Sequence, residues 1–487
     1  MNCLNKLKKY YLGGRDFLFY LFIFLLPWQT KLIIRPADTN FTEISLYARE
    51  LILLLWLLLV SISGACRSPK INWEQFKRNW AIKNKLTIFW CLMLIWWLLV
   101  ALSIFSASDQ LLSFSRLLLF SIGLGLVYFL KNKLDFSGQP CLEDFSVIDY
   151  QAKTDSVTEL KGGLSKLKII YVFLGSLILQ VVLGIYQFLT QSTPVCKYLG
   201  LAVHDPGVLG TAVVETLSGR WLRTYGGFDH PNIFGGVLVL GLILAAYLFS
   251  HQLEKLKNSG NKPIFSLGHW RSVKSVLGTD IFLLIFYFLS LAALFFTFSR
   301  GAWLALSVGL IILLVYFLKQ PIKSVRYRYL ALLFFSVIFL LVTALPYQEL
   351  IITRLRAEAR LEQKSLAERQ LYLNQAQKII REHIFTGVGS GNYTLALKNQ
   401  DLAWGQPSQP IWNYQPVHNF FLLLWAECGI FAFLVFSTIF AYLLIKNRRS
   451  GLKMAILVAL IILLFVDHWF WSLPFGTLML LFILGLI

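Results

Sequence analysis

Residues 416–445 read PVHNFFLLLWAECGIFAFLVFSTIFAYLLI, a polar His-Asn pair followed by a long apolar run from Phe420 to Ile445. A membrane-spanning helix needs about 20 predominantly apolar residues, because the hydrocarbon core of a bilayer is about 30 Å thick. Similar runs recur along the chain, in which 57% of the 487 residues are hydrophobic and 14% are charged. The sequence therefore predicts an all-α polytopic membrane protein.

Twelve apolar runs are candidates for spanning helices. They are 17–34, 44–63, 86–106, 111–130, 167–190, 231–250, 280–298, 302–318, 329–346, 418–445, 454–470 and 473–487. The last run is short for a bilayer at a rise of about 1.5 Å per residue. The first run has Pro27-Trp28-Gln29 where a signal peptide would have small residues, so we expect a membrane anchor there.

Lys and Arg concentrate in alternate connections between these runs, for example in 64–85, 131–168 and 251–279. Short basic loops stay in the cytoplasm, so this alternation predicts that both termini lie inside. It also places the two longest loops, 191–230 and 347–417, outside the membrane. The net charge of +20 then reflects topology, with attraction to anionic lipids as a second effect, and no nucleic-acid partner is expected.

The predicted organisation has an N-terminal part, 1–190, with the first five helices and a core, 191–487, with helices 6–12. A polar segment at about 131–166 interrupts the first part and is expected to be a disordered cytoplasmic insertion. In the second long loop, the apolar spacing from Glu349 to His383 predicts one or two amphipathic helices. The six cysteines are scattered and indicate neither a disulfide framework nor a thiolate metal site.

His418 is a candidate general base at the outer mouth of the helix that follows it. A histidine in the first turn of a helix lies beside the positive end of the helix dipole, which favours the neutral imidazole that a base requires. Asn419 could supply or accept a hydrogen bond beside it. Asp467, at the outer end of the eleventh run, could orient a histidine or pin helices together. An idle histidine at the membrane interface is the alternative.

Three arginines on the predicted outer face are candidates for binding an anion. Arg300 lies in a tight turn between two uncharged runs, a costly position unless an anion accompanies it. Arg223 precedes Phe-Asp-His-Pro-Asn at 228–232, a predicted helix start that attracts anions. Arg369 lies in the outer amphipathic helix. The alternative for Arg300 is snorkelling at the membrane interface. For Arg223 it is a cluster that only caps a helix, and for Arg369 it is a solvated helix face.

The glycine run Thr386 to Asn392, TGVGSGN, has two open interpretations. It is either a helix C-cap with a tight turn, or a wall of backbone past which a bulky polar substrate moves, with Gly389 in contact. A dinucleotide-binding loop is disfavoured because a helix, not a strand, precedes it.

A neutral histidine and several arginines at one membrane surface suit transfer from a lipid-linked diphosphate. Arg223, Arg300 and Arg369 could neutralise the leaving diphosphate through paired donors. His418 could take the proton of an acceptor hydroxyl as it attacks the anomeric carbon. No outer Asp-x-Asp pair, His-Glu-x-x-His motif or thiolate cluster occurs, so we expect neither a metal nor another cofactor.

Together these motifs resemble the O-antigen ligase and polymerase family of bacterial membrane proteins. The resemblance is strongest over about 200–445 and rests on the order and sidedness of five segments. They are Phe-Asp-His-Pro-Asn at 228–232, Ser299-Arg300-Gly301, Glu368-Arg369, the glycine run 387–392, and His418-Asn419 followed by Glu427-Cys428-Gly429.

The resemblance implies an enzyme of twelve helices with a large helical extracytoplasmic loop, like the metal-independent GT-C-type glycosyltransferases. It would be an inverting transferase that takes a glycan from an undecaprenyl-diphosphate donor at the outer face of the inner membrane. His418 would be the catalytic histidine, and Arg300 and Arg369 would bind the diphosphate. The implied substrate-binding residues are Arg223, His230, Asn232, Gly389, Asn419 and Asp467.

The acceptor stays open between three kinds of hydroxyl. A ligase would use a lipid such as lipid A-core, a polymerase would extend another lipid-linked glycan, and a protein O-oligosaccharyltransferase would use Ser or Thr. We rank the ligase first on the single large outer loop before His418. A transporter of lipid-linked glycans is the alternative of a different class, although the chain has no clear internal repeat.

Overall fold

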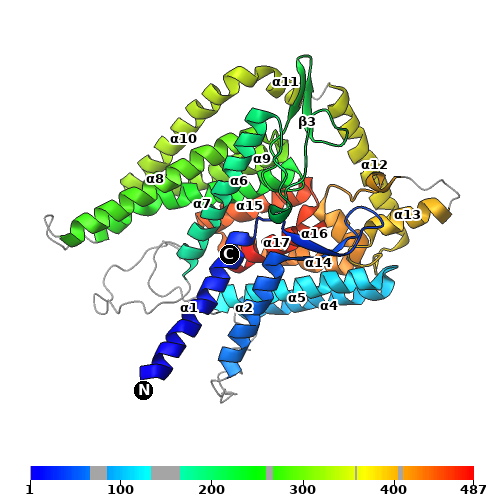
Figure 1. Ribbon diagram of the computed structural model, residues 1–487, viewed down its shortest axis with the longest axis horizontal. Coiled ribbons are helices and arrows are strands. Elements are labelled where there is room, and N and C mark those ends of the chain that lie inside the picture. The colour runs from blue at the N-terminus through cyan, green and yellow to red at the C-terminus, as the bar shows by residue number, and fades with distance from the viewer. Residues whose placement is uncertain (1, 66–84, 133–164, 259–266, 357–358, 404–409) are drawn as a thin grey trace.

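A computed structural model describes residues 2–65, 85–132, 165–258, 267–356, 359–403 and 410–487. Helices dominate these residues, as Figure 1 shows, and eight helices are long and apolar enough to cross a membrane. The chain is therefore a multi-pass membrane protein. Two further apolar helices, α15 (Gly451–Val466) and α17 (Pro474–Leu486), are shorter. The count of twelve spans stays a prediction.

The long helices follow most of the apolar runs of the sequence. They are α1 (Asn2–Leu25), α2 (Ala48–Ala65), α4 (Lys85–Leu102), α5 (Gln110–Asn132), α6 (Lys166–Thr190), α7 (Pro231–Asn258), α8 (Leu267–Phe296), α9 (Arg300–Leu318), α10 (Lys323–Ala344) and α14 (Phe420–Asn447). Helix α7 is buried along almost all of its apolar length, because α8, α9, α10 and α15 pack around it. It forms the centre of the bundle, as expected of a helix that is hydrophobic on every side.

Two short antiparallel sheets interrupt the helical pattern. Strand β1 (Lys31–Arg35) pairs with β2 (Ile44–Tyr47), and β3 (Val213–Thr216) pairs with β4 (Gly219–Leu222). The predicted span 17–34 is therefore wrong at its end, where α1 stops at Leu25 and β1 follows. A short apolar run with β-branched residues fits a strand as well as a helix, and periodicity cannot separate the two.

The segment between α10 and α14 folds into helices at one end of the bundle. These are α11 (Gln348–Arg356), α12 (Arg360–Glu382) and α13 (Tyr393–Ala403), so the amphipathic helices predicted between Glu349 and His383 are present. Helix α12 packs on α14 and buries Tyr372, Ala376 and Ile379. Figure 1 shows α11 and β3 together at the top of the view and α12 and α13 at its right.

The two predicted parts of the chain pack into one another. Helix α5 lies against α17, and α4 lies against α14, so N-terminal and C-terminal helices share one core. The domain division at residue 190 stays a prediction. Of the predicted insertion at about 131–166, residues 133–164 lie outside the described residues.

The glycine run is attached to a kink in α14. Gly429 has a φ of 80° and breaks the regular helix there. The Val388 amide donates to the Ala426 carbonyl, and the Gly389 amide donates to the Glu427 carbonyl, both at 2.9 Å. Carbonyls that a kink releases need new donors. The glycine run supplies them, which supports its interpretation as a structural turn.

Candidate functional site

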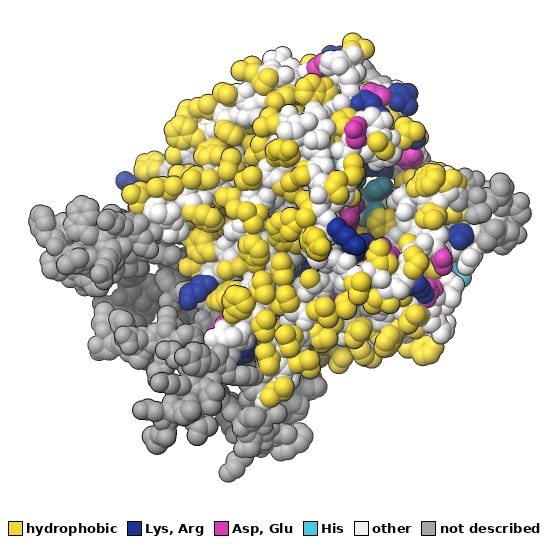
Figure 2. Space-filling model, viewed as in Figure 1, with side chains coloured by type: hydrophobic (Ala, Val, Ile, Leu, Met, Phe, Trp, Pro, Cys, Tyr) yellow, Lys and Arg dark blue, Asp and Glu magenta, His cyan; other side chains and the backbone are white. Residues whose placement is uncertain are grey.

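A cavity of about 410 Å³ lies where α7, α9 and α14 begin and α15 ends. Figure 2 shows a hollow in which histidine side chains are visible, with charged side chains around it and hydrophobic side chains over much of the remaining face. The cavity brings together most of the residues that the sequence singled out. Those that line it are Arg223, His230, Asn232, Arg300, Arg369, His418 and Asp467.

Arg223 is buried and begins a chain of hydrogen bonds that runs through Asn232 to Asp467. Its Nε donates to the Thr297 carbonyl at 2.7 Å, and a terminal nitrogen donates to Asn232 Oδ1 at 2.8 Å. Asn232 Nδ2 in turn donates to Asp467 Oδ2 at 3.3 Å. Burial, and then repulsion from Arg354, lower the pKa of Arg223 to about 9. Arg223 is thus charged at neutral pH and held in one position.

Arg300 is tied to the α11–α12 segment through a buried carboxylate. Arg300 lies 3.5 Å from Glu362 Oε2 and donates to the Arg354 carbonyl at 3.0 Å. Arg354 pairs with the other oxygen of Glu362 and donates to the Phe298 carbonyl from Nε at 3.2 Å and from a terminal nitrogen at 2.9 Å. Phe298 has a φ of 46° in the turn before α9. The Arg354–Glu362 pair therefore fixes the turn that carries Arg300.

Arg369 differs from these two arginines because it is exposed. It lines the cavity from α12, and no hydrogen bond or ion pair ties it to the described residues. Its donors are available to a ligand. Of the arginines around the cavity, it is the one with most freedom to follow a bound anion.

His418 precedes the helix instead of lying in its first turn, which corrects the sequence-based expectation. Asn419 is the N-cap of α14, and its Oδ1 accepts from the Leu422 amide at 3.0 Å. His418 Nδ1 lies 3.7 Å from Asp467 Oδ1, too far for a hydrogen bond, and has no partner among the described residues. Asp467, more than the helix dipole, is therefore the neighbour that can orient this ring.

Asp467 lies in the connection after α15, among three histidines. Burial by itself would raise the pKa of this carboxyl, but the contact with His418 and the charges of His418, His468 and His230 hold the pKa well below its usual range. Burial lowers the pKa of His468 to about 3, although Asp467 opposes this shift. Burial and then Arg223 lower the pKa of His230 to about 3. At neutral pH, the Asp467 carboxylate therefore lies beside the neutral imidazoles of His230 and His468.

His418, Asp467 and His468 also form a group with metal-ligand chemistry. One ligand atom of each residue lies within 4.8 Å of the other two. Two imidazoles and a carboxylate are ligands that zinc and related ions accept. The sequence does not reveal this group, because His418 and Asp467-His468 are far apart in the chain.

Gly389 and Asn419 were predicted to bind substrate but do not line the cavity. A Cβ on Gly389 would lie 2.4 Å from the Ala107 Cβ, and its φ is 94°, so close packing explains the glycine. The Asn419 side chain is used by the α14 cap and by the Phe465 carbonyl, to which Nδ2 donates at 3.2 Å. Both positions therefore have a structural role in the fold, and their predicted contact with substrate stays a prediction.

Arg354, which lines the cavity, and its partner Glu362 were not predicted from the sequence. Arg354 lies in α11 and Glu362 lies in α12, two amphipathic helices in which charged side chains usually form a solvated face. Their spacing of two helical turns across the α11–α12 break carries no recognisable signal. Only the fold reveals that they are buried.

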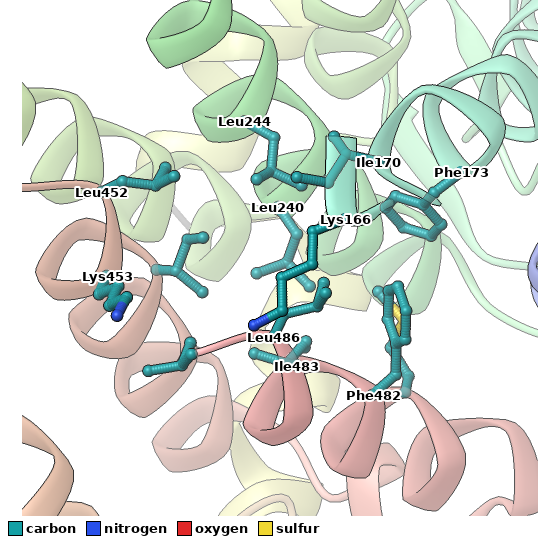
Figure 3. A pocket seen from close by; sticks show the side chains of 13 residues that line it. Lys166, Ile170, Phe173, Leu240, Leu244, Leu452, Lys453, Phe482, Ile483 and Leu486 are labelled. Atoms are coloured by element: carbon teal, nitrogen blue, oxygen red, sulfur yellow. The ribbon is translucent and has the colours of Figure 1, made fainter. Parts of the chain in front are cut away.

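A separate small cavity of about 40 Å³ lies between α6, α7, α15 and α17, as Figure 3 shows. Apolar side chains form most of its wall, and Lys166 and Lys453 supply its charges. It shares no lining residue with the larger cavity, and neither a histidine nor a carboxylate of the described residues lines it. We assign it to helix packing.

One segment of the chain matches a known protein family. Residues 285–437 match the model of the family named O-Antigen ligase, Wzy_C. No curated protein matches the chain. The matched segment contains Arg300, Arg354, Arg369 and His418, whereas Arg223 and Asp467 complete the cavity from outside it. Residues 285–437 are therefore similar to the O-antigen ligase domain that this family model describes.

Proposed function

We propose that this protein transfers a glycan from an undecaprenyl-diphosphate donor to an acceptor hydroxyl in the 410 Å³ cavity. The observation that carries this proposal is the meeting of arginines and a histidine–carboxylate pair in one cavity. Arg223, Arg300, Arg354 and Arg369 line it together with His418 and Asp467. This combination fits a substrate that has a diphosphate next to the bond that breaks.

The arginines have two complementary properties for binding a diphosphate. Arg223 and Arg354 are fixed by backbone carbonyls, so they supply a positive field that does not need to reorganise during the reaction. Arg300 and Arg369 are more accessible and could contact phosphate oxygens directly. Fixed charge in a partly buried site stabilises a leaving diphosphate more than the same charge in water.

The apolar part of the lining supports a lipid-linked donor. Leu304 of α9 and Leu463 and Val466 of α15 line the same cavity as the arginines. An isoprenoid chain could leave the cavity along these residues toward the bilayer, while its diphosphate stays with the arginines.

His418 is the proposed general base. As the acceptor oxygen attacks the anomeric carbon, its proton passes to His418, and the bond between that carbon and the diphosphate oxygen breaks. Both electrons of the broken bond leave with the diphosphate, and attack from the opposite side inverts the anomeric configuration. Asp467 orients the ring and stabilises the imidazolium that forms. The apo distance of 3.7 Å would shorten in the substrate complex.

The arginine charges make a catalytic metal unnecessary, so we expect transfer to proceed without one. We rank a lipid acceptor such as lipid A-core first, which makes the protein a ligase, and a growing glycan or a protein hydroxyl next. The distribution of Lys and Arg supports a cavity that faces the periplasm or the cell exterior from the inner membrane.

A transfer assay with purified protein tests this proposal. The donor is a lipid-linked oligosaccharide, the buffer contains EDTA, and wild type is compared with His418→Ala, Arg300→Ala and Arg360→Ala. Arg360 is a matched control, because it is an exposed arginine of α12 paired with Glu215 outside the cavity. We expect activity in wild type and Arg360→Ala and its loss in the other two variants.

Two results would contradict the proposal. Full turnover by His418→Ala would exclude a general-base role. Movement of intact donor between leaflets with no release of lipid diphosphate would indicate a transporter instead. A panel of lipid, glycan and peptide acceptors in the same assay separates ligase, polymerase and protein-modifying activities.

A further inference from the structure

His468 adds a second histidine to the His418–Asp467 pair, and the proposed transfer reaction does not use it. Its Nε2 lies 4.0 Å from Asp467 Oδ1, and its ring centroid lies 5.1 Å from that of His418. The side chain is buried, but it does not line the large cavity. His468 therefore approaches the His418–Asp467 pair from the protein interior and not from the cavity.

The hydrogen bonds around His468 prepare it as a ligand. Its Nδ1 lies 2.7 Å from Ser472 Oγ, and that hydroxyl can donate to the His468 carbonyl at 3.4 Å. The hydroxyl oxygen then accepts from Nδ1–H, which leaves the Nε2 lone pair directed toward Asp467. A hydrogen bond that fixes the second nitrogen of a histidine is typical of metal-binding histidines.

The other two ligand atoms are also available. His418 Nδ1 is a buried atom with no hydrogen-bond partner among the described residues. Asp467 Oδ1 accepts only the His468 amide, at 2.8 Å, among the hydrogen bonds of the described residues. In a tetrahedral zinc site, ligand atoms lie about 3.4 Å apart, as follows from metal–ligand bonds of about 2.0–2.1 Å. The two histidine nitrogens lie 3.7 and 4.0 Å from Asp467 Oδ1, and the three ligand atoms all lie within 4.8 Å of one another, so a bound ion would draw them closer together.

We propose that His418, Asp467 and His468 form a binding site for a single zinc-class divalent ion. Two imidazole nitrogens and one carboxylate favour Zn²⁺ and Co²⁺ over Mg²⁺ and Ca²⁺, which prefer oxygen ligands. His418 and Asp467 line the cavity, so the fourth position opens toward it and can hold water or a phosphate oxygen. The nearby arginines oppose a cation, and we therefore expect reversible binding.

Occupation of this site would inhibit the transferase, a consequence that rests on the proposed function. A ring coordinated through Nδ1 is a weaker proton acceptor, and Asp467 can no longer stabilise an imidazolium. The ion would then act as an inhibitor of a reaction that needs no metal.

Binding is tested on the full chain, purified in detergent without a histidine tag and stripped with EDTA. Zn²⁺ is titrated calorimetrically, and the absorption spectrum of bound Co²⁺ reports the coordination geometry. Wild type is compared with His468→Gln, which removes a ligand, and with Ser472→Ala, which removes only its hydrogen-bond partner. His383→Gln is the control for binding at an exposed histidine outside the group.

We expect one ion per wild-type chain, at least about a tenfold weaker affinity in His468→Gln and Ser472→Ala, and no change in His383→Gln. Equal affinity in wild type and His468→Gln would overturn the site, as would a Co²⁺ spectrum typical of six oxygen ligands. Ser472→Ala keeps the ligand set, so it remains informative if His468→Gln does not fold.

The experiments distinguish failure of the proposed metal site from failure of the proposed transfer activity. Zn²⁺ should inhibit wild-type transfer and inhibit His468→Gln only at about tenfold higher concentration. If Zn²⁺ binds at the site and the transfer rate does not change, the proposed inhibition is wrong. If no transfer occurs under any condition, calorimetry and the Co²⁺ spectrum still decide whether the ion binds there.

Discussion

The turn at 297–301 and the glycine run at 386–392 look equally unusual in the sequence, yet the fold uses them in different ways. The first turn places Arg300 at the cavity, and the buried Arg354–Glu362 pair supports it. The second turn places its backbone amides on the kinked α14 and lines no part of the cavity. One turn is built to present a charge, and the other is built to hold a helix.

This difference shows why a glycine-rich turn is a weak sign of a binding site. Glycine permits close approach to any backbone, whether it belongs to a ligand or to the protein itself. A charged residue in an apolar environment is more informative, because its position is costly unless something compensates the charge. The following substitutions separate the two turns by their effects on activity and on stability.

Arg300→Ala should have the largest effect, and it should act on catalysis. Loss of one preorganised charge at a leaving diphosphate costs about 3–4 kcal/mol of transition-state stabilisation, which corresponds to a decrease in kcat/KM of about 10²–10³. The melting temperature should change little, because the Arg354–Glu362 pair remains. A large drop in melting temperature with normal kcat/KM would mean that the turn is structural.

Glu362→Ala should destabilise the protein by about 3 kcal/mol, because it leaves the buried Arg354 without its carboxylate partner. Chemical denaturation of the purified protein measures this free energy. Glu215→Ala is the control, since it breaks an exposed pair with Arg360 on the same helix, α12. Equal effects of the two substitutions would contradict a supporting role for the buried pair.

Gly387→Ala should destabilise the protein by about 2 kcal/mol while the folded fraction stays active. Its φ is 64°, and an added Cβ would lie 2.3 Å from the carbonyl of Glu427. The substitution thus forces the glycine run away from α14. Thermal unfolding measures the loss, and kcat per folded molecule checks the activity. Gly210→Ala is the control, because Gly210 also has a positive φ but an added Cβ there would meet no atom of the described residues beyond its two chain neighbours. It measures the backbone strain alone, without the steric overlap that Gly387→Ala adds.

Asn419→Ala should have the smallest effect, a destabilisation of about 1 kcal/mol from the lost cap of α14. Asn419→Asp should restore most of this stability, because aspartate is also a good cap. A strong loss of donor affinity in Asn419→Asp, with stability retained, would support the substrate contact predicted from the sequence. Thermal unfolding and a donor-binding assay distinguish the two outcomes.

The sequence was sufficient to predict the helical membrane class, because runs of apolar residues have few other uses at this length. It also singled out Arg300, Arg369 and His418, three residues that now line one cavity, and it resembled the family whose model matches residues 285–437. Arg300 and His418 stand out because they adjoin long apolar runs, whereas Arg369 is one charge among many in an amphipathic helix. The physical cost of charge near a membrane makes such positions visible without a structure.

The features that were not predicted depend on tertiary contacts. The strand β1 follows an apolar run that continues from α1, so composition alone extends the helix too far. Arg354 and Glu362 are ordinary charges of amphipathic helices until the fold buries them. His468 gains importance only because α15 ends beside the start of α14, which no local pattern indicates.

The most direct test of the central claim is the affinity of undecaprenyl diphosphate for the purified protein. Titration of wild type, the Arg300→Ala/Arg369→Ala double variant and Arg360→Ala compares the cavity with a control arginine. We predict an increase in Kd of about 100-fold or more for the double variant, at about 1.4 kcal/mol per tenfold change, with an unchanged melting temperature. An equal Kd in all three proteins would contradict diphosphate binding by this cavity.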